Sequence, residues 1–189
     1  MSKNGSLIAP EVLVVDDEED IRDLIAGILG DEGYEARVAA DSDSALAAMR
    51  LRRPQLLILD IWLQGSKLDG IQILEQVKRD HPDLPVVMIS GHGTIETAVS
   101  SIKKGAYDFI EKPFKADRLV HVAQRALEAA RLRREVQELK LKAGDDSELI
   151  GQSSAISQVR QQIDKIAPTG SRVLITGAAG AGKEVIARL

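Results

Sequence analysis

The sequence contains no cysteine, so it can form neither a disulfide framework nor a thiolate metal site. It also has no run approaching the roughly 20 apolar residues that a membrane span needs, and its first residues lack the apolar core of a signal peptide. The net charge of −4 lacks the basic surplus expected of a chain that binds nucleic acid along its whole length. These absences predict a cytoplasmic protein without a membrane partner.

What the sequence does have is a regular alternation of short apolar runs and helix-length amphipathic segments. The runs are continuously apolar, which is typical of strands covered on both faces of a sheet. Strands that alternate with helices predict a parallel sheet with right-handed crossovers. We therefore expect an α/β fold, a flavodoxin-like, doubly wound, five-stranded parallel sheet. Its strands should cover Val12–Val15, Glu35–Ala39, Leu56–Leu59, Val86–Ile89 and Asp108–Ile110, with helices over Ile21–Leu29 and Asp43–Arg50 among those between them.

A long helix without breakers is expected from Ala116 to about Ala143, before the sequence GDDS that begins at Gly144. Its second half repeats apolar residues at alternating spacings of three and four, flanked by Arg and Glu, which is the pattern of a coiled-coil seam. The alternative is that the helix merely covers the sheet, although its first turns already suffice for that. We expect residues 129–147 to form a coiled-coil linker of a homodimer, with a seam of Ala129, Leu132, Val136, Leu139 and Ala143.

Five polar residues follow the expected strands, namely Asp16, Asp17, Asp60, Ser90 and Lys112. The carboxyl ends of parallel strands open on one edge of a sheet, where ligands bind, so these residues should converge. Crowded carboxylates repel one another and their pKa values rise unless a cation neutralises them, and Mg²⁺ prefers such oxygen ligands. Any one of the five could be an ordinary strand-end polar residue. All five in this order predict a metal-dependent site.

The segments VLVVDDEEDIR, LLILDIWL, VVMISGHG and AYDFIEKPF resemble the receiver domain of bacterial two-component response regulators, over about the first two-thirds of the chain. DIWLQGSKLDG together with SGHGTIETAVSSIKKGAYDFIEKPF is similar to the NtrX branch of the NtrC group, which acts in nitrogen regulation. The resemblance implies a receiver over residues 11–128 after a tail of residues 1–10. It also implies a sensor histidine kinase of the NtrY kind as phosphodonor. The loop Ile61–Gly70 is a couple of residues longer than in the usual receiver, which would alter access for the phosphodonor.

The resemblance also assigns a role to each polar residue. Asp60 would be the phosphoacceptor, and Lys112 and Ser90 would contact the phosphoryl oxygens. Mg²⁺ would be bound directly by Asp17, partly through water by Asp16, and by Asp60 and the backbone carbonyl of Trp62. Phe109 stands where the family carries its switch aromatic, although plain core packing explains it nearly as well. A cis peptide is implied before Pro113, the third member of the switch set with Ser90 and Phe109.

A second motif, GAAGAGKE, begins at Gly177 and should follow a strand over Arg172–Thr176 and open a helix. The spacing G-x-x-x-x-G-K is that of a loop whose backbone N–H groups cradle phosphates, although a simple strand–helix turn can look alike. Residues 148–189, with a helix expected over Ser153–Ile166, resemble the start of the AAA+ domain of sigma-54-dependent activators, in which Glu after the Lys is normal. The nucleotide-binding set would be Gly177, Gly180, Gly182, Lys183 and Glu184.

The second resemblance implies a longer protein with ATPase and DNA-binding domains, which would bind ATP and engage DNA and RNA polymerase. We expect the chain as given to be a phosphoacceptor switch rather than an enzyme, apart from self-dephosphorylation. It stops before an acidic Walker B strand, and residues after Lys142 should be mobile because their core is incomplete. One alternative is a P-loop nucleotide-dependent enzyme with a flavodoxin-like domain, but Asp16-Asp17 stands where a flavin site has hydroxyl and glycine residues. Another alternative is a pseudo-receiver that binds partners without phosphorylation, but the presence of Asp60 and Lys112 argues against it.

Overall fold

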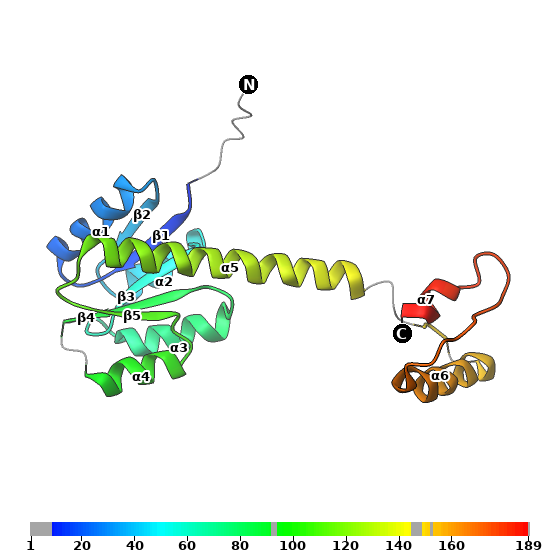
Figure 1. Ribbon diagram of the computed structural model, residues 1–189. Helices are drawn as coiled ribbons and strands as arrows, with labels where there is room; N and C mark the ends of the chain where they lie inside the picture. Colours follow the sequence, from blue (N-terminus) through cyan, green and yellow to red (C-terminus); the bar gives the residue numbers. More distant parts are fainter. Residues whose placement is uncertain (1–8, 92–93, 145–148, 152, 189) are drawn as a thin grey trace, which may run out of the picture. The chain divides into compact units, whose positions relative to one another are not determined.

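The computed structural model describes residues 9–91, 94–144, 149–151 and 153–188. Its N-terminal unit is a five-stranded parallel sheet in the order β2-β1-β3-β4-β5, with helices on both faces (Figure 1). The strands are β1 Glu11–Val15, β2 Glu35–Ala39, β3 Leu56–Asp60, β4 Val86–Ser90 and β5 Asp108–Glu111. The helices are α1 Glu19–Asp31, α2 Ser42–Leu51, α3 Gly70–Asp80, α4 Ile95–Lys103 and α5 Ala116–Gly144. The predicted fold class and all five predicted strands are confirmed.

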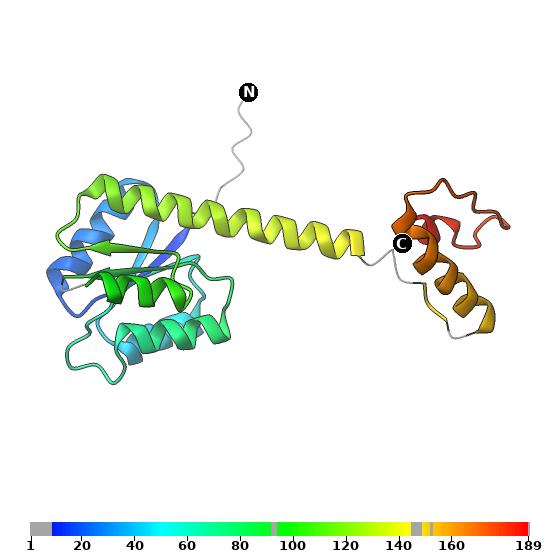
Figure 2. The same ribbon diagram turned by 60° about the horizontal axis from the view of Figure 1, so that its bottom comes forward.

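The sheet separates two apolar layers, because successive strand residues point to opposite faces. One layer packs the strands against α1 and the first turns of α5, and the other packs them against α2 and α3 (Figures 1 and 2). β1, β3 and β4 are buried along their whole length. Their continuous apolar runs therefore reflect burial on both faces, as the sequence pattern indicates.

The register of the sheet brings the carboxyl ends of its central strands level. Val15 of β1 pairs with Leu59 of β3, and Asp60 pairs with Ile89 of β4. Ser90 pairs with Glu111 of β5, so Lys112 follows at the next position. The polar residues at these strand ends are thereby held at one edge of the sheet.

Helix α5 runs unbroken from Ala116 to Gly144, which confirms the predicted long helix. Leu119, Val122 and Ala126 are buried against the sheet. Farther along the helix, the large side chains of the predicted seam are exposed to solvent in the single chain. Leu132 and Val136 are each 48% exposed, and Leu139 is 64% exposed. Ala129 is half-buried, and the side chain of Ala143 lies outside the described residues, as do the linker residues 145–147. The dimeric seam stays a prediction.

Beyond α5 the described chain forms α6 Ser154–Ile166, a 3₁₀ turn Ala167–Thr169 and α7 Lys183–Arg188. Helix α6 is confirmed, and Ser153 caps it by accepting a hydrogen bond from the Ile156 N–H at 3.3 Å. The strand predicted over Arg172–Thr176 is wrong. A strand needs a neighbour for its backbone hydrogen bonds, and no described residue after α5 lies in one. Leu174 is 87% exposed there, and the predicted mobility after Lys142 is untested.

Among the described residues, no helix combines the length and the apolar character that crossing a lipid bilayer requires.

Candidate functional site

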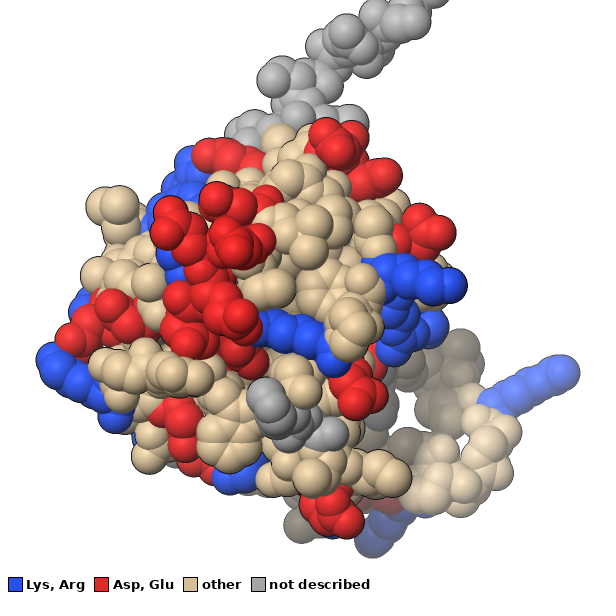
Figure 3. Space-filling view, turned by 90° about the vertical axis from the view of Figure 1, so that its left-hand side faces the viewer, with Lys and Arg blue, Asp and Glu red and all other residues tan. Residues whose placement is uncertain are grey.

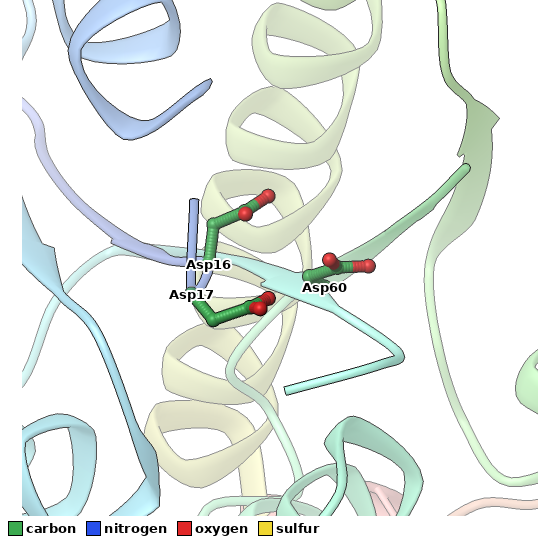
Figure 4. A group of neighbouring side chains, drawn as sticks. All are labelled: Asp16, Asp17 and Asp60. Atoms are coloured by element: carbon green, nitrogen blue, oxygen red, sulfur yellow. The ribbon is translucent and has the colours of Figure 1, made fainter. Parts of the chain in front are cut away.

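Three carboxylates meet at the carboxyl edge of the sheet, as the sequence predicts. Asp16 and Asp17 follow β1, and Asp60 ends the adjacent β3. One oxygen of each carboxylate lies within 4.8 Å of the others, and the three side chains extend to the same side (Figure 4). Asp16 is 1% exposed and Asp60 5%, so their charges are shielded from water. Acidic side chains also gather on the outer surface of this face (Figure 3).

The ammonium group of Lys112 contacts two of these carboxylates. Its Nζ atom is 2.7 Å from Asp16 Oδ2 and 3.1 Å from Asp60 Oδ2. It is also 3.3 Å from Oε1 of the exposed Glu18. Lys112 is directed inward from the end of β5, where its own N–H donates to the Ser90 carbonyl at 2.8 Å. The peptide bond between Lys112 and Pro113 is cis, which confirms that prediction.

Burial raises the pKa of the Asp60 carboxyl above its ordinary value, the Lys112 ammonium opposes this rise, and the negative charge of Asp16 adds to it. Burial alone would lower the pKa of Lys112, but its hydrogen bonds to Asp16 and Asp60 and their negative charges raise it overall. The crowding expected from the sequence therefore contributes to the rise for Asp60, but burial is the largest cause.

The raised pKa of Asp60 predicts that Asp60→Asn stabilises the metal-free fold at neutral pH. A carboxyl whose folded pKa lies above its unfolded value destabilises the fold when ionised. That penalty is fully present above the folded pKa and disappears as pH falls below the unfolded one. Urea unfolding in EDTA should show a higher midpoint for the variant at pH 7 and a smaller difference near pH 4. A variant less stable than wild type at pH 7 would contradict the prediction.

Two contacts at this edge escape sequence reasoning. Arg22, in the first turn of α1, donates from Nη1 to the carbonyls of Asp16 and Asp17 at 2.7 and 3.0 Å. Gly70, at the start of α3, lies against the backbone of Asp60 so closely that a Cβ atom there would be 2.0 Å from the Asp60 carbonyl oxygen. Nothing in the residue pattern distinguishes Arg22 from a surface arginine. The sequence DG at the start of α3 is a signal for Gly70, although turns use it equally.

The remaining predicted site residues lie near the same edge. Ser90 ends β4 and is fully buried. Phe109, on β5, is half-buried against the layer of α2 and α3 and also lines a groove with residues of α4 and α5. Pro113 lines the same groove. Trp62 follows Asp60 by two positions and is 54% exposed. Their roles in metal binding and switching stay predictions.

The glycine-rich motif forms a turn before α7. Gly180 and Gly182 both have φ of 77°, in the left-handed region that glycine tolerates. Lys183 folds back onto the turn, with Nζ 3.0 Å from the Gly177 carbonyl and 2.6 Å from that of Ala178. Glu184 is exposed.

Comparison with known proteins decides the family. Residues 12–124 match the family model of the response regulator receiver domain. The chain belongs to the response regulator receiver family. Residues 149–189 match the model of the sigma-54 interaction domain, so this receiver is followed by part of a second domain.

Relatives of this receiver carry the NtrX name. The nitrogen assimilation regulatory protein NtrX of Azorhizobium caulinodans is 60% identical over 182 residues, which cover 96% of the chain and 40% of that protein. NtrX from Brucella abortus in complex with ATP is 63% identical, with a TM-score of 0.70 over 95% of the chain and 39% of that structure. The separate receiver domain of that NtrX is 72% identical, with a TM-score of 0.61 over 62% of the chain and 98% of that structure. The chain thus spans about 40% of its full-length relatives.

Proposed function

We propose that the receiver accepts a phosphoryl group on Asp60 from a sensor histidine kinase, with Mg²⁺ bound beside it. The observation that carries the proposal is the cluster of Asp16, Asp17 and Asp60, with the Lys112 ammonium against the first and last of them. This cluster lies at the end of the sheet where α/β folds bind ligands. A carboxylate nucleophile, a cation and a metal-ligand set lie within a few ångströms there.

The donor set suits Mg²⁺. Asp60 Oδ1 is buried without a hydrogen-bond partner among the described residues, although most buried polar atoms have one. Carboxylate oxygens are the ligands that Mg²⁺ prefers, together with water and phosphate oxygens. Asp16, Asp17, Asp60 and the backbone carbonyl of Trp62 would bind the ion. When bound, it neutralises negative charge on the phosphoryl oxygens.

The residues of the chain then have separate tasks in the transfer. A carboxylate oxygen of Asp60 attacks phosphorus, and the bond between phosphorus and the donor histidine nitrogen breaks with its electron pair leaving on the imidazole. The product is an acyl phosphate on Asp60. Lys112 stabilises the charge spread over the transferring group, and the Ser90 hydroxyl donates to one of its oxygens. Rearrangement of Ser90 and Phe109 around the phosphoryl group would shift the population of receiver conformations.

In the longer protein, this switch would control transcription. The match of residues 149–189 to the sigma-54 interaction domain and the name of the Azorhizobium relative support this part of the proposal. ATP would bind at Gly177, Gly180, Gly182, Lys183 and Glu184, and one NtrX structure contains ATP. DNA and RNA polymerase would be engaged through further domains. Under this proposal the protein would act in the cytoplasm, because DNA and RNA polymerase are found there.

The test of the acceptor is the intact mass of the chain after incubation with Mg²⁺ and acetyl phosphate. Wild type should gain the mass of one phosphoryl group, and Asp60→Asn should gain none. Asp31→Asn, at the exposed end of α1, is the matched control and should behave as wild type. Absence of any gain in folded wild-type chain would overturn the proposal in favour of a partner-binding module without phosphorylation.

We propose further that α5 joins two copies through the seam of Ala129, Leu132, Val136 and Leu139, whose large side chains are exposed in the single chain. Val136→Asp places a charge where two helices would pack, so it should convert a dimer to a monomer. Sedimentation equilibrium measures this, with Gln137→Asp, which adds the same charge at an exposed position off the seam, as a control for charge alone. If the wild-type chain stayed monomeric over a roughly 100-fold range of protein concentration, the proposed dimer would be contradicted.

A further inference from the structure

The loop between β3 and α3, residues 61–69, is fastened to the start of α2. The Ser42 N–H donates to Ser66 Oγ at 2.9 Å, and the Leu68 N–H donates to Ser42 Oγ at 3.4 Å. Together these bonds join the first residue of α2 to the middle of the loop. We call Ser42, Ser66 and the Leu68 N–H the loop latch.

The Ser42 hydroxyl has no part in capping its own helix. That task belongs to Asp41 and Ser44, each of which accepts a hydrogen bond from the other's backbone N–H. Yet Ser42 is 1% exposed, and a buried hydroxyl is costly unless it is hydrogen-bonded. The bond to the loop therefore accounts for a buried polar residue that helix formation leaves unexplained.

The latch supplements the anchors at the ends of the loop. Its base is closed by the Gly70 N–H, which donates to the Ile61 carbonyl at 2.9 Å. Leu63 is buried in the apolar layer that includes Ala45 and Met49 of α2, and Leu68 packs at its border. The segment from Gln64 to Lys67 has no buried apolar side chain, so polar contacts fix it. Besides the latch, these are the exposed ion pair of Lys67 with Asp43 of α2 at 2.6 Å and the Ser66 N–H, which donates to the Leu63 carbonyl at 3.3 Å. An exposed ion pair contributes little, so the half-buried latch is the stronger tie to α2.

We infer that Ser42 and Ser66 are positioning residues, which hold this loop and with it the Trp62 backbone carbonyl that the proposed function assigns to the Mg²⁺ site. The inference rests on the proposed function, because it concerns the same Mg²⁺ site. Groups that orient metal ligands from outside the coordination sphere change metal affinity by roughly 10–100-fold when they are removed. The loop that carries Trp62 begins immediately after Asp60, so a displaced loop moves a ligand without changing the carboxylates.

The experiment is a Mg²⁺ titration of the 189-residue chain followed by the fluorescence of Trp62, its single tryptophan. Ser42→Ala and Ser66→Ala should each weaken Mg²⁺ binding, by about 10-fold on this basis. Raising Mg²⁺ to saturation should restore the rate of phosphorylation by acetyl phosphate, which a general loss of folding would not allow. Ser66→Thr keeps a hydroxyl at a half-buried position and should bind Mg²⁺ as wild type does.

Ser44→Ala is the matched control, because it weakens the cap of the same helix without touching the loop. It should lower thermal stability but leave Mg²⁺ affinity unchanged. Should Ser42→Ala fail to fold, the half-buried Ser66 carries the test alone. If wild type binds Mg²⁺ and the folded Ser66→Ala chain binds it equally well, the latch inference is overturned while the proposed function stands. If wild type neither binds Mg²⁺ nor gains a phosphoryl group, the proposed function is wrong, and the inference that rests on it is wrong as well.

Discussion

Lys112→Met should slow phosphorylation of Asp60 by acetyl phosphate about 100-fold at saturating Mg²⁺, because fixed charges that stabilise a transition state in a buried site contribute effects of this size. Methionine has a similar length and fills the same space but carries no charge. The Lys112 Nζ atom is within 3.1 Å of both Asp16 and Asp60, and the side chain is 10% exposed, so water replaces its charge poorly. The measurement is the rate of phosphoryl mass gain under single-turnover conditions.

Lys115→Met is the control for this prediction. Lys115 lies three residues along the same connection, is exposed, and lines the groove beside α4 rather than the carboxylate cluster. Its replacement should leave the rate within about twofold of wild type, since an isolated exposed charge contributes little. An unchanged rate in folded Lys112→Met would mean that the ammonium only offsets charge in the metal-free state.

The sheet and its polar edge could be predicted from the sequence because they follow from local patterns. Continuous apolar runs mark buried strands, and parallel connectivity places the residue after each run at one edge, whatever the details of packing. Asp16, Asp60 and Lys112 converge for this reason alone. That reasoning needs no knowledge of which side chains touch.

The contacts that support the site could not be predicted in this way, since they depend on tertiary packing. Arg22 and Ser42 have the residue types of ordinary helix starts, and only the fold brings them against the loops after β1 and β3. The strand expected over Arg172–Thr176 fails for the opposite reason. Its apolar pattern is local, but a strand also needs a paired neighbour, which the described part of that unit does not contain.

Gly70→Ala should lower the free energy of unfolding by about 3 kcal/mol, at the upper end of what overpacking costs. A Cβ atom at this position would lie 2.0 Å from the Asp60 carbonyl oxygen and 2.8 Å from the Ile61 Cα atom. Both are backbone atoms, so no side chain can rotate away to relieve the contact. Either α3 or the end of β3 must shift, and the hydrogen bond from the Gly70 N–H to the Ile61 carbonyl shifts with it.

Because β3 ends at Asp60, that shift should reach the proposed phosphoacceptor as well as the fold. Folded Gly70→Ala should bind Mg²⁺ more weakly and gain a phosphoryl group more slowly than wild type. Gly27→Ala in α1 is the matched control, since a Cβ atom there meets nothing within 4 Å and alanine favours a helix interior by about 0.5–1 kcal/mol. Urea unfolding should therefore move in opposite directions for the two variants. If Gly70→Ala were as stable as wild type, the close approach of α3 to β3 would have to relax freely, and the backbone of Asp60 could not be held as tightly as the proposed chemistry requires.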